Sequence, residues 1–173
     1  MSAGLDLRGY QEGILSRLKL AAQQTGDTRS SYLGVVIGER KVLVNLLEIS
    51  ETLPMLNLQA VPLTKPWFLG VANVRGNLYS INDLAQVIGE TPTKLSSSTR
   101  LMLVNNDLSN NVGLVVDRLI GLRNTADMKK KKLKQANAFC MKAFEYTDSS
   151  AEVWQELDCY QLVKSAEFIN PSY

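Results

Sequence analysis

The segment from residue 67 to residue 89, WFLGVANVRGNLYSINDLAQVIG, constrains the fold more than any other stretch, because its local pattern specifies three successive elements. An apolar run ends at Val74, and the Arg-Gly-Asn sequence at 75–77 predicts a turn, since glycine and asparagine tolerate a positive φ. Residues 78–81 then predict the second strand of a β-hairpin. We expect Asn82 to cap a short helix, with Asp83 in its first turn and Gly89 at its end.

Further short strands are predicted on both sides of this segment. We expect them at 32–37, 41–47, 100–105, 112–116, 118–122, 137–146 and 151–157. In the strand at 41–47, Val42 and Val44 alternate with Leu43, so both of its faces are expected to be buried. Many short strands with turn signals between them indicate an all-β fold with short helices.

Two other segments are interpreted as non-strand structure. Residues 50–66 carry Pro54, Pro62 and Pro66, which predicts a long connection without regular structure. Near the C-terminus, Asp158 is expected to cap a final helix with Cys159, Leu162, Val163 and Ala166 on one side.

The N-terminal 30 residues are interpreted as a separate unit ahead of a domain at 31–170. A helix is predicted over 6–22, with an apolar stripe at Leu7, Tyr10, Ile14, Leu18 and Ala21 that Leu15 and Leu20 widen. A polar stretch at 25–31 predicts a linker. The stripe suits packing on the chain's own domain or contact with a partner. We expect the domain to fold without this helix.

Composition excludes several classes of function. The formal net charge is only +2, from 19 basic and 17 acidic residues, so neither nucleic acid nor a membrane surface is expected as the main partner. No signal-peptide core and no apolar run of the ~20 residues that a spanning helix needs are present, so a cytoplasmic protein without membrane insertion is expected. Histidine is absent, and the two cysteines, Cys140 and Cys159, are expected to be buried and reduced. No phosphate-binding or metal-binding motif occurs, so we expect no catalytic residues, metal or cofactor.

Four consecutive lysines, Lys129, Lys130, Lys131 and Lys132, form the densest charge run in the chain. One interpretation is a solvated loop. The other is an electrostatic docking site for an acidic partner surface.

The order of several motifs resembles the CheW family, the coupling proteins of bacterial chemosensory arrays. The resemblance rests on Gly70, Asn73, Arg75 and Gly76 followed by an apolar strand and Asp83-Leu84, on Glu48-Ile49, and on VGLVVD at 112–117. It spans roughly residues 31 to 168. The extended N-terminus and the second half look most like the family's twitching-motility member.

This resemblance implies a fold of two five-stranded SH3-like barrels around a shared apolar core. It implies a non-catalytic adaptor between the cytoplasmic tip of a methyl-accepting chemoreceptor and the regulatory domain of a CheA-type histidine kinase, with type IV pilus twitching motility as the output. The residues expected to contact these partners are Glu48, Gly70, Asn73, Arg75 and Gly76, with Glu48 and Arg75 as an ion pair.

Two alternatives from other classes stay open. A small β-barrel enzyme would show a closed polar pocket with convergent ionisable groups, whereas an adaptor would show shallow grooves and exposed apolar patches. A generic SH3-like peptide-binding scaffold outside chemosensing would lack the second barrel.

Overall fold

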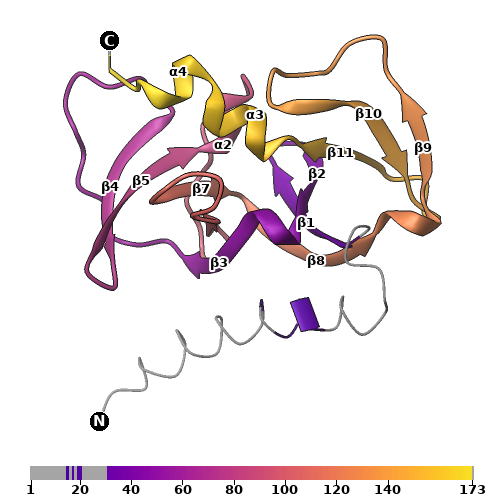
Figure 1. The fold of residues 1–173 in the computed structure, drawn as a ribbon, viewed down its shortest axis with the longest axis horizontal. Helices are drawn as coiled ribbons and strands as arrows, with labels where there is room; N and C mark the ends of the chain where they lie inside the picture. The colour runs from indigo at the N-terminus through magenta and orange to yellow at the C-terminus, as the bar shows by residue number, and fades with distance from the viewer. Residues whose placement is uncertain (1–14, 16, 18, 21–30, 173) are drawn as a thin grey trace.

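In the computed structural model, the described part of the chain comprises Leu15, Arg17, Lys19, Leu20 and residues 31–172. It forms two β-sheets side by side (Figure 1). The six-stranded sheet has the order β8 (Arg118–Asn124), β1 (Ser31–Ile37), β2 (Arg40–Asn45), β11 (Val153–Leu157), β10 (Met141–Thr147) and β9 (Lys129–Lys132). The five-stranded sheet has the order β3 (Ile49–Pro54), β6 (Arg100–Val104), β7 (Val112–Val116), β5 (Asn77–Asp83) and β4 (Phe68–Val74).

The five-stranded sheet is one continuous insertion between β2 and β8 of the other sheet. Most neighbouring strands are antiparallel, while β11 runs parallel to β2 and β5 runs parallel to β7. The short helices are η2 (Leu46–Glu48), α2 (Leu84–Val87), η3 (Thr125–Asp127), α3 (Cys159–Lys164) and α4 (Ala166–Ile169). The all-β class with short helices is therefore confirmed, but one sheet has six strands where five were expected, because the lysine run forms the additional strand β9.

The largest core cluster joins the two sheets. It includes Val42 and Val44 from the six-stranded sheet and Met102 and Leu114 from the five-stranded sheet. Leu43 points the other way, into a smaller cluster with Tyr32, Tyr146 and Trp154. Strand β2 is thus buried on both faces, as its continuous apolar sequence predicted.

The hairpin and helix at 67–89 form as predicted, except that the helix cap lies one residue later than expected. Strands β4 and β5 pair antiparallel across the turn, and Gly89 follows helix α2 with φ +85°. The helix cap is Asp83 rather than Asn82, since Asp83 Oδ1 accepts from Ala85 N at 3.2 Å. Asn82 remains in the strand and donates from Nδ2 to the Gly113 carbonyl at 3.1 Å, which ties β5 to β7.

The expectation that residues 50–66 lack regular structure is wrong for their first part. Ile49–Pro54 forms β3, which pairs antiparallel with β6. Proline is tolerated here because Pro54 is the last residue of an edge strand, where no ladder hydrogen bond is lost. The later part of the segment remains irregular, apart from isolated bridges of Gln59 with Val71 and of Thr64 with Ser172.

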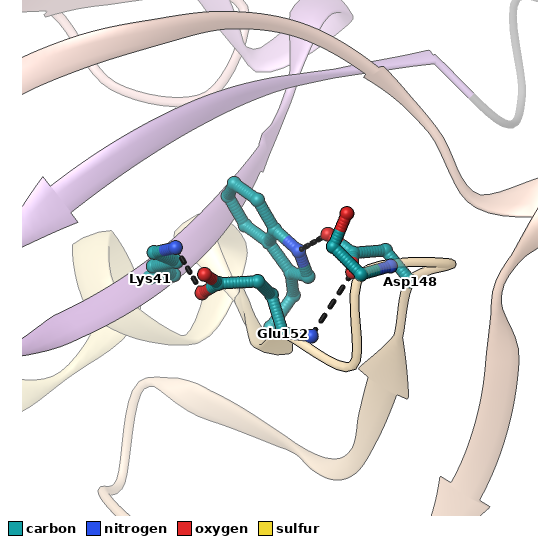
Figure 2. A network of polar contacts seen from close by, with 5 residues as sticks. Lys41, Asp148 and Glu152 are labelled. Atoms are coloured by element: carbon teal, nitrogen blue, oxygen red, sulfur yellow. Dashed lines mark hydrogen bonds and ion pairs between the residues drawn. The ribbon is translucent and has the colours of Figure 1, made fainter.

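The turn between β10 and β11 is held by one carboxylate (Figure 2). Asp148 accepts hydrogen bonds from Trp154 Nε1 at 2.9 Å and from the backbone N–H groups of Ser150 and Glu152 at 2.9 and 3.0 Å. The Glu152 carboxylate in turn pairs with Lys41 on β2. These contacts fix the β10–β11 hairpin to the neighbouring strand.

The C-terminal helices cross from one sheet to the other (Figure 1). Asp158 caps α3 as predicted, accepting from Gln161 N at 3.0 Å. Phe168 of α4 stacks on Trp67 beside β4, with ring centroids 5.3 Å apart. Ala166 does not lie on the predicted apolar side of the helix. The first helix ends before Ser165, and a second helix begins after it.

Most of the N-terminal helix predicted over 6–22 lies outside the described residues. Of those described, Leu15 is buried in the main core cluster, and Lys19 Nζ donates to the Ile49 carbonyl at 2.6 Å. At these two residues the segment packs on the domain, which favours the first of its two interpretations.

Candidate functional site

The β4–β5 turn projects Arg75 from the tip of the hairpin. Arg75 has φ +49° and Gly76 has φ +85°, so the left-handed residues are these two and not Asn77. Asn73 Oδ1 accepts from Gly76 N at 2.9 Å and so closes the turn. A left-handed arginine is uncommon, and the closed turn holds it in place.

Arg75 pairs with Glu51 and not with the predicted Glu48. Its Nη2 contacts Glu51 Oε1, and the side-chain exposed fractions are 53% for Arg75 and 11% for Glu51. The buried carboxylate therefore gains its charge compensation from a cation that remains half exposed. Glu51 was not among the predicted site residues because no strand was expected at 49–54. Had β3 been recognised, a glutamate between Ile49 and Leu53 on the strand's inward face would have been a candidate partner for a cation.

This ion pair joins two distant strands of the same sheet. Glu51 lies on β3 and Arg75 follows β4, and these are the two edge strands of the five-stranded sheet. The contact requires the sheet to curl until its edges approach, as in a small barrel.

A hollow of about 170 Å³ lies where the two edges meet. Its lining is mainly apolar but includes Arg75 and Asn73; the residues are Leu53, Pro54, Met55, Leu56, Asn73, Val74 and Arg75. Such an open apolar surface with one cation and one amide suits contact with a partner side chain.

Glu48 lies at a different place, the junction between the two sheets. It ends η2, the short connection from β2 to β3, and its Oε2 is buried without a hydrogen-bond partner. The charges that act on it are those of Lys142, Asp158 and Glu156. Burial is the largest cause that raises its pKa, to about 7. The predicted pair with Arg75 fails because η2 turns Glu48 toward β10 and β11, three residues before β3 presents Glu51.

Gly70 and Gly76 serve the backbone near the site in different ways. Gly70 has φ +142°, and a Cβ there would lie 2.4 Å from the Gln59 carbonyl oxygen. That carbonyl accepts from Val71 N at 2.9 Å, so glycine permits the connection at 59 to lie against β4. Gly76 completes the turn, and nothing lies within 4 Å of a Cβ built there.

The four lysines lie on β9, at the far edge of the other sheet from the β4–β5 hairpin (Figure 1). All four are exposed, as both interpretations of the run required, but they form a strand and not a loop. The structure thus brings together Asn73, Arg75 and Gly76 of the predicted site residues. Gly70 supports the same hairpin, while Glu48 and the lysines lie elsewhere.

In the described part of the chain, the cysteine and acidic side chains outside this site do not form a second candidate site. Cys140 and Cys159 are buried and free, as expected, and burial raises the pKa of each thiol to about 12. Among the residues described, no group of three or more acidic or cysteine side chains has the arrangement of a metal site. Nor does any helix in that part have the length and apolar character to cross a bilayer.

Comparison with known proteins gives the class that this architecture defines. The family model of the CheW-like domain matches residues 31–167. The chain belongs to the CheW-like domain family, and the resemblance seen in its sequence motifs is confirmed.

Particular relatives are similar over part of their length. PilI of Pseudomonas aeruginosa strain PAO1 is 33% identical over 105 residues, which cover 61% of this chain and 58% of PilI. The chemotaxis protein CheW of Helicobacter pylori strain 26695 is 28% identical over 97 residues, which cover 56% of this chain and 58% of that protein. The matched region is therefore less than two thirds of each relative.

A solved structure shares the fold. The scaffolding protein TtCheW from Thermoanaerobacter tengcongensis superposes with a TM-score of 0.64 at 14% identity, covering 74% of this chain and 88% of TtCheW. The CheW-like arrangement of two sheets is thus confirmed.

Proposed function

We propose that this chain is a non-catalytic adaptor that couples a methyl-accepting chemoreceptor to a CheA-type histidine kinase in the cytoplasm. The observation that carries the proposal is the CheW-like domain match across residues 31–167. The partners are the cytoplasmic tip of the receptor and the regulatory domain of the kinase. The similarity to PilI supports type IV pilus twitching motility as the output.

The hollow beside Arg75 supports a docking role. Its apolar lining residues offer burial for a partner side chain, and the half-exposed guanidinium of Arg75 offers a directional hydrogen bond. We assign Arg75 and Asn73 to direct partner contact, and Gly70 and Gly76 to shaping the hairpin that presents them. Glu51, in place of the predicted Glu48, pairs with Arg75 and holds it in position.

The proposed mechanism is geometric. The adaptor holds receptor and kinase in one assembly. Through the adaptor, the receptor's conformation can bias the kinase only if the adaptor binds the two receptor states, or the two kinase states, with different affinity. A rigid double sheet with a shared core suits this task, because displacement of one sheet is transmitted to the other through packed side chains. The two-sheet architecture also favours this role over a single-barrel peptide-binding scaffold.

Binary binding measurements with purified receptor tip and kinase regulatory domain test the proposal. Arg75→Ala should weaken binding to at least one of them by about tenfold or more, as expected of an arginine at the centre of an interface. Arg118→Ala removes another exposed arginine, on the edge strand β8, and serves as the matched control. Failure of the wild-type chain to bind either partner would contradict the adaptor role.

A further inference from the structure

Strand β9 ends the six-stranded sheet with an open edge. It pairs with β10 on one side, and no strand in the described part of the chain pairs with its other side (Figure 1). Its four residues are all lysines and all exposed. An open edge leaves backbone N–H and C=O groups available to a further strand.

The lysines divide between the two faces of the sheet. Lys130 and Lys132 lie opposite Tyr146 and Phe144 of β10, and Lys130 Nζ is 3.9 Å from the centroid of the Phe144 ring. Contact with an aromatic face holds this ammonium close to the sheet.

The other face differs in charge. Lys129 and Lys131 lie opposite Thr147 and Glu145, so a carboxylate already shares this face. An incoming anionic group is therefore attracted more strongly to the face of Lys130 and Lys132.

Intramolecular ion pairs do not neutralise the lysine strand. The ion pairs of the described residues involve Arg40, Lys41, Arg75 and Lys142, and none involves β9. Like charges on neighbouring positions of one face repel each other, so pairing with a second copy of β9 along this edge is disfavoured. The same charge favours a strand that carries carboxylates, which relieves the repulsion and satisfies the open backbone groups.

We propose that β9 is the docking edge for an extended acidic segment of a partner protein, which adds to the six-stranded sheet with its carboxylates on the face of Lys130 and Lys132. A peptide is favoured over an anionic membrane because it satisfies the backbone and the charges together. This proposal does not depend on the adaptor role, and it gives the chain a second contact surface remote from Arg75.

A synthetic peptide of alternating glutamate and valine is the probe. Its binding to the full chain is measured by fluorescence anisotropy, and amide chemical shifts of Lys129–Lys132 report whether the edge itself is engaged. The control is the same peptide with N-methyl groups on the backbone nitrogens that would face β9, which keeps the charge and removes the hydrogen bonds. Vesicles of phosphatidylglycerol and phosphatidylcholine form a second arm.

We expect the unmodified peptide to bind and to shift the β9 amides, the methylated peptide to bind at least about tenfold more weakly, and the vesicles to bind weakly. The double variant K130S/K132S should lose about tenfold in affinity, and K129S/K131S, which removes the same charge from the other face, should lose less. Equal binding of both peptides, equal loss in both variants, stronger binding to vesicles, or absence of binding would each overturn the proposal. These outcomes leave the Arg75 experiment unaffected, so the two proposals fail separately.

Discussion

Arg75 forms an ion pair with Glu51 across the closing edges of the five-stranded sheet, and the predicted partner Glu48 lies instead at the junction of the two sheets. The glutamate is nearly buried and the arginine half exposed. The pair therefore stabilises the curled sheet while its cationic half remains accessible to a partner.

Arg75→Ala should destabilise the fold by roughly 1–2 kcal/mol, because it leaves the Glu51 carboxylate buried without its cation while solvent screens part of the effect. Urea unfolding measures the loss. Combining Arg75→Ala with Glu51→Ala should give a non-additive effect, whereas Arg75→Ala with Glu48→Ala should be additive within about 0.5 kcal/mol. Additivity for both combinations would contradict the assigned pairing.

Glu48 should make stability depend on pH between about 4.5 and about 7. Its folded pKa, about 7, lies above the ordinary value of 4.5, so the native state holds the proton more tightly than the unfolded state. Stability should therefore fall as the pH rises through this window. The loss in free energy of unfolding should be about 1–2 kcal/mol. This is less than the free energy equivalent to the full pKa shift, because the carboxyl keeps some contact with solvent.

Glu48→Gln should flatten this dependence, since glutamine stays neutral throughout. Unfolding midpoints measured across the range from about pH 4.5 to about pH 7 provide the comparison, with Glu39→Gln on the exposed β1–β2 turn as the control. The same pH slope in wild type and Glu48→Gln would show that another group is responsible.

Gly70→Ala and Gly76→Ala should differ in cost although both glycines have a positive φ. At Gly70 the added Cβ meets the Gln59 carbonyl oxygen, so backbone strain and a backbone clash combine, for roughly 2–4 kcal/mol. At Gly76 only the strain applies, at about 1 kcal/mol. Thermal or urea unfolding ranks the two, and a larger loss at Gly76 would refute the contact between residue 59 and β4.

The fold was predictable from the sequence where the signals are local. Turn residues and alternation give the β4–β5 hairpin, and the continuous apolar run gives the doubly buried β2. Strand β3 was not predictable in this way because Pro54 resembles a strand breaker, and only its position at the end of an edge strand makes proline acceptable.

The candidate site was predictable only in part. Arg75 and Asn73 belong to one local turn, so their closeness to each other follows from that turn. The choice between Glu48 and Glu51 depends on how far the sheet curls and on where η2 directs a side chain, and both are long-range properties. The lysine run shows the same limit, since its pairing with β10 depends on residues 12 to 18 positions away.

Leu15 connects the N-terminal segment to the main core, with 3% of its surface exposed. Leu15→Ala should cost about 2–5 kcal/mol, as for other buried leucines. Leu20, which is exposed, should tolerate the same change within about 0.5 kcal/mol. Removal of residues 1–28 should therefore lower stability while leaving a cooperative transition, and equal stability of the truncated and full chains would contradict the packing of Leu15.

We propose that the chain bridges receptor and kinase, and a co-sedimentation experiment measures this bridging. The cytoplasmic tip of the receptor is displayed on vesicles, and the kinase regulatory domain is added with the wild-type chain, with Arg75→Ala, or alone. The kinase domain should sediment with the vesicles when the wild-type chain is present, and much less with Arg75→Ala or without the chain. Sedimentation of the kinase domain to the same extent in all three mixtures would show that the chain does not bridge the two partners.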